Sequence, residues 1–287
     1  MSLKNPSLNY NHLLVDDLIL YPYLNEELIR DLPKFKTSPG DVFLVTYPKA
    51  GTFWLGEIVY NIAKPKGISD SNEENRVDAI PLLEYVPQAQ LEAYPSPRYV
   101  KTHLPYDRVP HNSQHNIKYI YLARNPRDVA VSYFHNLRGI VDFEWDGTWK
   151  EFLGYFMQGK VPYGSYCAHV LEWWKHKDDE NLLFIKYEDM KQNLKGHVNL
   201  IAEFLGFNLT EEESKSIAQK CMFQAMKANP KTNLDQYPDF FKPGNSFMRK
   251  GIIGDWSNYF ADDQLTEFDK WCQSHMDGIG LEFEFTV

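Results

Sequence analysis

The sequence has 287 residues, 43% of them hydrophobic and 15% aromatic, which is enough apolar content for one large domain with a substantial core. Its 39 acidic residues outnumber its 30 basic residues, and the net charge of −9 argues against a general nucleic-acid binder while allowing a local basic pocket for a small anion. Three dispersed cysteines, an N-terminus without a signal pattern and the absence of a long apolar run predict a cytoplasmic protein with neither disulfide framework nor membrane span.

Short apolar runs alternate with amphipathic segments along the chain. The apolar runs are rich in β-branched and aromatic residues, as strands covered on both faces are, and they lie at 41–47, 98–101, 117–123 and 182–187. Helical periodicity predicts helices at 52–64, 126–138, 163–177, 190–205, 211–220 and 262–276. This order predicts an α/β fold, with a single domain over 1–287 and a central, mainly parallel sheet flanked by helices. Ligands of such sheets bind at the carboxyl ends of the strands.

Three segments lack periodicity. Residues 66–76 and 107–116 are polar and predict surface loops. The segment from about 227 to 251 is longer and ends in the string FMRKG, which carries adjacent cations. Structureless segments of that length are uncommon in compact domains unless they are disordered or functional. We therefore expect this segment to form a lid over an anion.

The stretch VTYPKAGTFW, residues 45–54, joins the first predicted strand to the first predicted helix. The first turn of a helix presents unpaired N–H groups and a partial positive charge, Gly51 allows close approach of a ligand to the backbone, and Lys49 adds a full charge. The corner therefore predicts a P-loop-like phosphate site, although a plain turn with a solvated lysine has the same short pattern. The string GxxxxGK[ST] is absent, which disfavours a nucleoside-triphosphate kinase.

Several longer strings occur together in one order: YPKAGTFW (47–54), VKTHLP (100–105), ARNPRDVAVSYFH (123–135), YGSYCAHVLEWW (163–174), YEDM (187–190) and FMRKGIIGDW (247–256). The first is similar to the phosphosulfate-binding loop of the cytosolic sulfotransferases, usually YPKSGTTW, and the others match that family's motifs between about residues 40 and 260. The resemblance implies transfer of a sulfuryl group from 3′-phosphoadenosine 5′-phosphosulfate (PAPS) to a hydroxyl or amine, with 3′-phosphoadenosine 5′-phosphate (PAP) as product.

The resemblance assigns the catalytic roles to four residues. Lys49 contacts the leaving oxygen, Lys101 stabilises the sulfuryl oxygens, and His103 is the general base. Lys101 and His103 are two apart at a strand end, so their side chains are expected on one side. Ser132 contacts the 3′-phosphate and holds Lys49 until the donor binds. Without the resemblance, His103 reads equally as a structural histidine, and Ser132 as part of a capped surface helix.

The donor site implied by the resemblance has three parts. The backbone amides of Ala50, Gly51, Thr52 and Phe53 cradle the 5′-phosphate, with the Thr52 hydroxyl as an addition. The 3′-phosphate is held by Arg124, Ser132, Arg249, Lys250 and the Gly251 amide. Aromatic faces for adenine come from Trp54, Phe223 and Tyr187, although Trp54 is also a candidate for core packing. The remaining donor contacts fall on Cys221, Met222, Phe247 and Met248.

Three departures from the family pattern stand out. Ala50 and Phe53 replace a serine and a threonine, and Cys221-Met222-Phe223 replaces the usual Thr-Ser-Phe, with the loss of a hydrogen bond to adenine. The dimerisation pattern KxxxTVxxxE falls on Ser257, Ala261-Asp262 and Thr266 and is absent. We therefore expect a monomer, or a dimer formed through another surface.

The acceptor positions implied by the resemblance are Tyr21, Tyr23, Leu82, Tyr85, Lys101, His103, Phe134 and Ile140. These residues favour a phenol, then a phenolic amine such as a catecholamine, then a hydroxysteroid. An acid among Glu84, Asp142, Glu144 and Asp146 is a candidate partner for an amine, although solvated acids are the simpler interpretation. No metal is expected, because the nine histidines lack ligand spacing. A PAPS-binding protein without turnover and a small-molecule phosphotransferase are the alternative functions.

Overall fold

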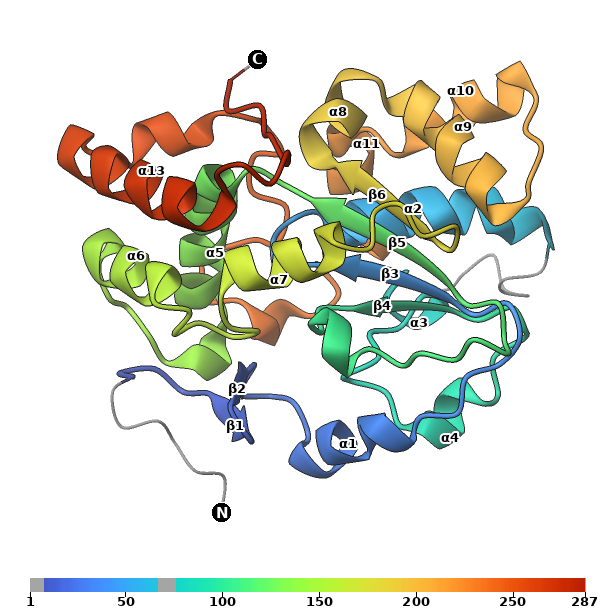
Figure 1. The fold of residues 1–287 in the computed structure, drawn as a ribbon, viewed down its shortest axis with the longest axis horizontal. Helices are drawn as coiled ribbons and strands as arrows, with labels where there is room; N and C mark the ends of the chain where they lie inside the picture. The colour runs from blue at the N-terminus through green and yellow to red at the C-terminus, as the bar shows by residue number, and fades with distance from the viewer. Residues whose placement is uncertain (1–7, 67–75, 287) are drawn as a thin grey trace.

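The computed structural model describes residues 8–66 and 76–286. Its centre is a parallel sheet in the order β4-β3-β5-β6 (Figure 1). The strands are β3 (Val42–Thr46), β4 (Tyr99–Thr102), β5 (Lys118–Ala123) and β6 (Leu182–Lys186). All four strands expected from the sequence are confirmed, and so is the parallel α/β architecture. The predicted loop at 66–76 falls almost wholly outside the described residues.

Each strand contributes to two separate cores, because alternate side chains point to opposite faces. Phe43 and Val45 of β3 belong to the core on one face, and Val42 and Leu44 belong to the core on the other. Both faces are therefore apolar, which is why the strands appear as continuous apolar runs in the sequence.

Helices cover both faces of the sheet (Figure 1). One core is closed by α2 (Thr52–Ala63), α9 (Leu194–Leu205) and α10 (Glu211–Lys220). The other is closed by α5 (Pro126–Gly139), α6 (Trp149–Met157), α7 (Tyr166–Trp174) and α13 (Asp262–Met276). The shorter elements are β1 (Leu13–Val15), β2 (Leu18–Leu20), α1 (Glu26–Asp31), α3 (Arg76–Ala79), α4 (Gln88–Leu91), α8 (Tyr187–Gln192), α11 (Phe223–Ala228) and α12 (Pro230–Asn233).

Two predicted helices need correction. The segment 190–205 is not one helix, because α8 ends before Asn193, whose side chain accepts the Gly196 N–H and caps α9. The helix predicted from residue 163 begins at Tyr166, because Tyr163 and Gly164 both have positive φ angles that a helix excludes. The sequence analysis also missed α6, which starts with a capping box formed by Thr148 and Glu151.

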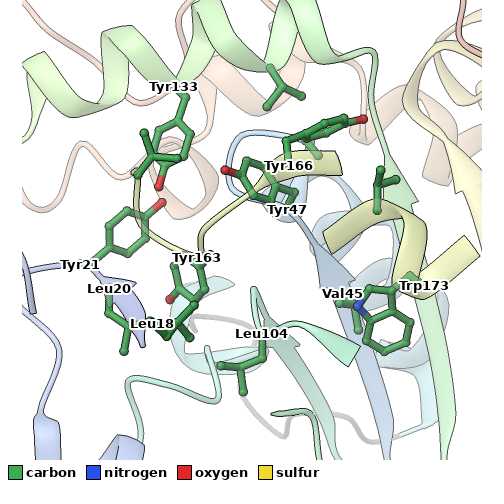
Figure 2. Packing of buried hydrophobic residues seen from close by; sticks show 14 of the residues in the cluster. Leu18, Leu20, Tyr21, Val45, Tyr47, Leu104, Tyr133, Tyr163, Tyr166 and Trp173 are labelled. Carbon is green, nitrogen blue, oxygen red and sulfur yellow. The ribbon is translucent and has the colours of Figure 1, made fainter. Parts of the chain in front are cut away.

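Buried tyrosines connect one core to the carboxyl ends of the strands (Figure 2). Their hydroxyls donate to main-chain carbonyls: Tyr47 to Gly164 at 2.7 Å, Tyr133 to Pro162 at 2.9 Å and Tyr166 to Arg124 at 2.5 Å. A buried hydroxyl is costly unless it is bonded, so these contacts fix the main chain as well as fill space.

The segment predicted as a lid is largely irregular. It contains α12 and a 3₁₀ turn at Pro238–Phe240, and between Phe241 and Gly254 it has neither helix nor extended strand. It is attached to the end of α5 by a bridge between Ile140 and Phe241 and by a bond from Lys242 N to Gly139 O. A second 3₁₀ turn, Asp255–Asn258, follows it.

The C-terminal segment lies against that second turn. Trp256 Nε1 donates to Phe285 O at 2.7 Å, and Trp174 Nε1 donates to Ile279 O at 3.1 Å. Residues 279–285 thus connect α7 to the base of the predicted lid.

Candidate active site

A cavity of about 450 Å³ opens at the carboxyl ends of the strands, as the sequence predicts. A residue that lines the cavity follows each strand of the sheet: Lys49 after β3, His103 after β4, Arg124 after β5 and Tyr187 after β6. The parallel register brings these four positions together although they span more than a hundred residues of sequence.

The corner after β3 has an unusual backbone. Lys49 has a φ of +69° and Gly51 a φ of +120°, so the chain turns sharply between β3 and α2. A Cβ on Gly51 would lie 3.0 Å from Leu122 Cδ2 and 3.2 Å from the Tyr187 ring, so only glycine fits. The turn leaves the first residues of α2 on the wall of the cavity, where Gly51, Thr52 and Phe53 line it. Helix N-termini placed in this way bind anions.

Lys49 is half-buried in the wall of the cavity. Its Nζ donates to Asn136 Oδ1 at 3.0 Å and lies 4.4 Å from the centroid of the Phe247 ring. Burial, with the nearby charges of Arg124 and Arg249, lowers the pKa of Lys49 to about 7. The expected contact with Ser132 is therefore replaced by one with Asn136, one helical turn further along α5. Ser132 itself lines the cavity.

His103 is fixed in one tautomer. Its Nδ1 is 2.8 Å from the Thr46 carbonyl oxygen, which can only accept, so Nδ1 carries the proton and Nε2 keeps a free lone pair. Burial and the charges of Lys49 and Lys101 lower the pKa of His103 to about 3, so the ring is neutral near pH 7. An imidazole in this state can accept a proton at Nε2.

Lys101 and His103 both line the cavity, which confirms the expectation that they lie on one side of the strand end. Lys101 Nζ donates to the Arg76 carbonyl oxygen at 3.3 Å and lies 4.5 Å from the centroid of the Phe53 ring. Phe53, which stands where the related family has a threonine, therefore packs on the Lys101 side chain.

The cations of the predicted lid are held by one buried acid. Arg249 Nη1 and Lys250 Nζ each lie 2.5 Å from a different oxygen of Asp255. The lid is also bonded to α5, since Asp128 accepts the N–H groups of Gly254 and Trp256.

Arg124 connects the corner to the lid. It donates to the carbonyl oxygens of Lys49 at 3.3 Å and Ile252 at 3.0 Å, while its buried Nε has no partner among the described residues. Its Nη2 lies 3.7 Å from Asp128 Oδ2, and the side chain lines the same cavity as Arg249 and Lys250, a combination suited to an anionic ligand.

Aromatic rings form a shelf on one wall. Trp54 and Tyr187 meet edge to face at 4.9 Å, and Trp54 Nε1 donates to Cys221 O at 2.8 Å. Phe223 packs so tightly on Gly251 that a Cβ there would lie 2.0 Å from the ring. Trp54, Tyr187, Phe223 and Gly251 all line the cavity, so Trp54 is a wall residue rather than part of the core interior.

Comparison with known proteins identifies the chain. The family description "Sulfotransferase domain" matches residues 39–280. Mouse sulfotransferase 1B1 is 41% identical over 271 residues, covering 91% of this chain and 89% of the relative. Human sulfotransferase 1E1 is 38% identical over 262 residues, covering 88% and 89%. This chain belongs to the sulfotransferase family. It is therefore an enzyme of the transferase class.

Solved structures agree with that assignment. Mouse sulfotransferase SULT7A1 complexed with PAP superposes with a TM-score of 0.78 at 33% identity, covering 92% of this chain and 93% of the other. Retinol dehydratase in complex with androsterone and inactive cofactor PAP superposes with a TM-score of 0.82 at 27% identity, covering 96% and 91%.

Most of the residues assigned from the sequence line the cavity of this sulfotransferase. The residues assigned to the acceptor that line it are Tyr21, Tyr23, Leu82, Tyr85 and Ile140, and those of the predicted lid are Phe247, Met248, Arg249, Lys250 and Gly251. Thr52 lines it too, although its hydroxyl is 2.6 Å from the Thr46 hydroxyl.

Four assigned residues do not line the cavity. Ala50 is fully buried and its N–H donates to Tyr47 O, so it is not an open cradle amide. Phe134 lies in the core, 5.5 Å from the Trp149 ring and 5.8 Å from the Phe152 ring. Cys221 is buried, and Met222 is largely exposed outside the cavity.

The cavity wall also contains residues that the sequence analysis missed. They include Asn136, Lys191, Tyr94, Tyr237 and Phe240. The described lining residues include six basic side chains, namely Lys49, Lys101, Arg124, Lys191, Arg249 and Lys250, and no carboxylate. In a chain of net charge −9 this local excess marks an anion site. The four acids considered as amine partners are absent from this lining.

Within residues 8–66 and 76–286, no helix is long and apolar enough to cross a membrane, and no group of His, Cys, Asp or Glu side chains is arranged to hold a metal ion.

Proposed function

We propose that this enzyme transfers the sulfuryl group of PAPS to the hydroxyl of a phenol, with His103 as general base. The observation that carries the proposal is the neutral imidazole of His103, with a free Nε2, in the same cavity as Lys49 and Lys101. A single cavity thus contains a base for the acceptor and cations for an anionic donor.

The donor binds along the cationic wall. Support comes from the PAP in two related structures and from the six basic side chains of the lining. The 5′-phosphate meets the N–H groups at the start of α2 and Lys49. The 3′-phosphate meets Arg124, Ser132, Arg249, Lys250 and the Gly251 amide, and adenine stacks among Trp54, Phe223 and Tyr187.

Transfer then follows an in-line displacement. His103 Nε2 takes the proton of the acceptor hydroxyl while the acceptor oxygen bonds to the sulfur of PAPS. The bond from that sulfur to the phosphate oxygen breaks at the same time. Lys49 meets the charge on the leaving oxygen, and Lys101 meets the charge on the sulfuryl oxygens. PAP and the sulfate ester of the acceptor leave as products.

Phenols are the first choice of acceptor because the acceptor end combines aromatic rings with aliphatic side chains: Tyr21, Tyr23, Leu82, Tyr85 and Ile140. Phenolic amines rank second, since the described lining offers no carboxylate to pair with an amine. Hydroxysteroids rank third, and the androsterone bound to retinol dehydratase keeps them on the panel.

The decisive experiment is incubation with labelled PAPS and a panel of phenols, catecholamines and steroids, for the parent and for His103→Ala. The variant is expected to lose at least about 100-fold in kcat, the usual contribution of a general base, while PAP affinity stays within about twofold. Undiminished transfer by the variant would refute the role of His103. PAP binding without transfer to any acceptor would instead favour a non-catalytic binding protein.

Two further properties belong to this proposal. We place the enzyme in the cytoplasm, which agrees with three cysteines that are all free thiols. We also expect a monomer, or a dimer that does not use residues 257–266, because that segment lacks the family's dimerisation pattern.

A further inference from the structure

Glu84 is a fully buried carboxyl that the mechanism above does not use. It lies in segment 81–85, which runs beside β4 through bonds from Lys101 N to Pro81 O and from Leu83 N to Lys101 O, both 2.8 Å. The segment therefore extends the sheet at the edge next to the cavity. Leu82 and Tyr85 line the cavity, whereas Glu84 does not. Its Oε1 accepts the main-chain N–H of His103 at 2.7 Å.

Within residues 8–66 and 76–286, the carboxyl of Glu84 has no balancing cation. No ion pair within the described part of the chain includes it, and its buried Oε2 has no hydrogen-bond partner there. Burial raises the pKa of Glu84 to about 7, although the His103 N–H acts in the opposite direction. The His103 N–H and the nearby Thr102 and Tyr163 hydroxyls offset only part of this effect, so the carboxyl is buried at a cost to stability beside the proposed base.

His103 is held from several sides. Glu84 accepts its N–H, His169 Nε2 lies 3.0 Å from its carbonyl oxygen, and Thr46 accepts from its ring. The ring of Tyr163 lies 5.2 Å from the imidazole, and this residue has a φ of +66°, which is rare for a side chain of its size. The Tyr163 hydroxyl and the Glu84 carboxyl are close enough for each to shift the pKa of the other.

The electrostatics of the reaction make this arrangement useful. When His103 accepts a proton, a new positive charge forms beside Lys49 and Lys101, which disfavour it. With its pKa near 7, Glu84 is ionised at higher pH, and a carboxylate on the main-chain side of His103 would then oppose that repulsion.

We propose that Glu84 is a positioning residue for sulfuryl transfer: its carboxylate fixes the main chain of His103 and supplies the negative charge that stabilises the imidazolium formed during the reaction. The proposal rests on the proposed role of His103 as general base. It assigns Glu84 no contact with donor or acceptor, so its removal should affect the rate of transfer and not donor binding.

The test compares Glu84→Gln, which keeps the size and an acceptor oxygen but loses the charge, with Glu84→Ala, which loses both. PAP affinity is measured by calorimetry, and kcat is expressed per PAP-binding site, so a poorly folded fraction does not count. We expect Glu84→Gln to lower kcat about tenfold with PAP affinity within twofold, and Glu84→Ala to lower kcat further. If Glu84→Ala does not fold, Glu84→Gln alone decides.

Glu188 offers a matched control, because it is also a buried carboxyl with one unpartnered oxygen and one that accepts a main-chain N–H, that of Asn125 at 2.9 Å. We expect Glu188→Gln to leave kcat per site within about twofold. An equal loss in both variants would overturn the proposal, because it would be a general effect of removing a buried charge.

Three other outcomes separate the hypotheses. A kcat for Glu84→Gln within twofold of the parent, or a parallel loss of PAP affinity, overturns the role of Glu84. In the His103→Ala background, Glu84→Gln should change the residual rate by less than twofold, and a further tenfold loss would show that Glu84 acts independently of His103. Undiminished activity of the single variant His103→Ala would refute the role of His103 as general base, independently of the kcat of Glu84→Gln.

Discussion

Lys49 combines a strained backbone with a perturbed charge. It lies between β3 and α2 with a positive φ, and its ammonium is partly buried near Arg124 and Arg249. Because those effects lower its pKa from 10.5 to about 7, the free enzyme holds Lys49 mostly uncharged above neutral pH. A bound phosphate favours the charged form, so donor binding and protonation of Lys49 should be coupled.

This coupling predicts proton uptake. At pH 8, binding of PAP should take up roughly one proton at Lys49. At pH 6 this uptake should vanish, because Lys49 is then already charged, and the PAP phosphates, whose second pKa is about 6, should instead release protons. Calorimetry in buffers of different ionisation enthalpy measures the number directly. Lys49→Met should abolish the uptake at pH 8. An uptake that is unchanged in the variant would show that another group titrates.

Phe134 does not have the surroundings that the family resemblance predicts for it. Its ring packs among Trp145, Trp149 and Phe152 rather than in the cavity. Phe134→Ala should therefore lower the free energy of unfolding by about 3–5 kcal/mol and leave the ranking of acceptors unchanged. Denaturant unfolding and KM values for two phenols check both parts, and an altered acceptor ranking at unchanged stability would return Phe134 to the acceptor site.

Among the elements, the lid depends most on a few polar contacts. Its cationic stretch has no regular structure, and Asp255 and Asp128 connect it to the rest of the fold. Arg249 and Lys250 are thus positioned by a carboxylate rather than by a helix or strand. This explains why the cationic end of the lid can be irregular and still have a defined place.

Asp255→Asn should therefore weaken PAP binding by about tenfold, because two cations lose the charged partner that positions them. The same variant should be cut faster by protease within residues 242–252. Calorimetry and limited proteolysis give the two measurements. Tighter PAP binding in Asp255→Asn would mean that the carboxylate mainly competes with the phosphate.

At the scale of the whole molecule, one acidic chain gathers six basic side chains around a single cavity. At this scale we also predict the oligomeric state. Sedimentation should give a monomer, or a dimer that persists when residues 257–266 are changed. Ser257 lies in a 3₁₀ turn and Thr266 in α13, where its hydroxyl bonds the Asp262 carbonyl. A dimer that dissociates when these residues are altered would contradict the expectation.

The sequence was sufficient to predict the central sheet and many of the residues that line the cavity. Strands buried on both faces give unmistakable apolar runs, and the site residues follow those runs directly, as Lys49, His103 and Arg124 do. What could not be predicted depends on contacts distant in sequence. Asn136 bonds Lys49 across 87 positions, and nothing in the periodicity of α5 indicates which of its side chains faces the cavity.

The predicted helix boundaries were wrong where local backbone conformation sets the start or end of a helix. Positive φ angles at Tyr163 and Gly164 delay the start of α7, and a side-chain cap at Asn193 divides what appears to be one helix. Phe134 was predicted wrongly for a different reason. The family resemblance places it in the acceptor pocket, but its ring packs against Trp145 and Trp149 in the core.

The C-terminal segment 279–285 has a practical consequence. Phe285 and Ile279 accept bonds from Trp256 and Trp174, and the Arg127 guanidinium lies 4.1 Å from the centroid of the Phe285 ring. Trp256 follows directly after the acid that secures the lid. Deleting residues 279–286, or fusing an affinity tag next to them, should therefore disturb the lid on the opposite side of these contacts. The expected result is a change in the affinity of the enzyme for its nucleotide.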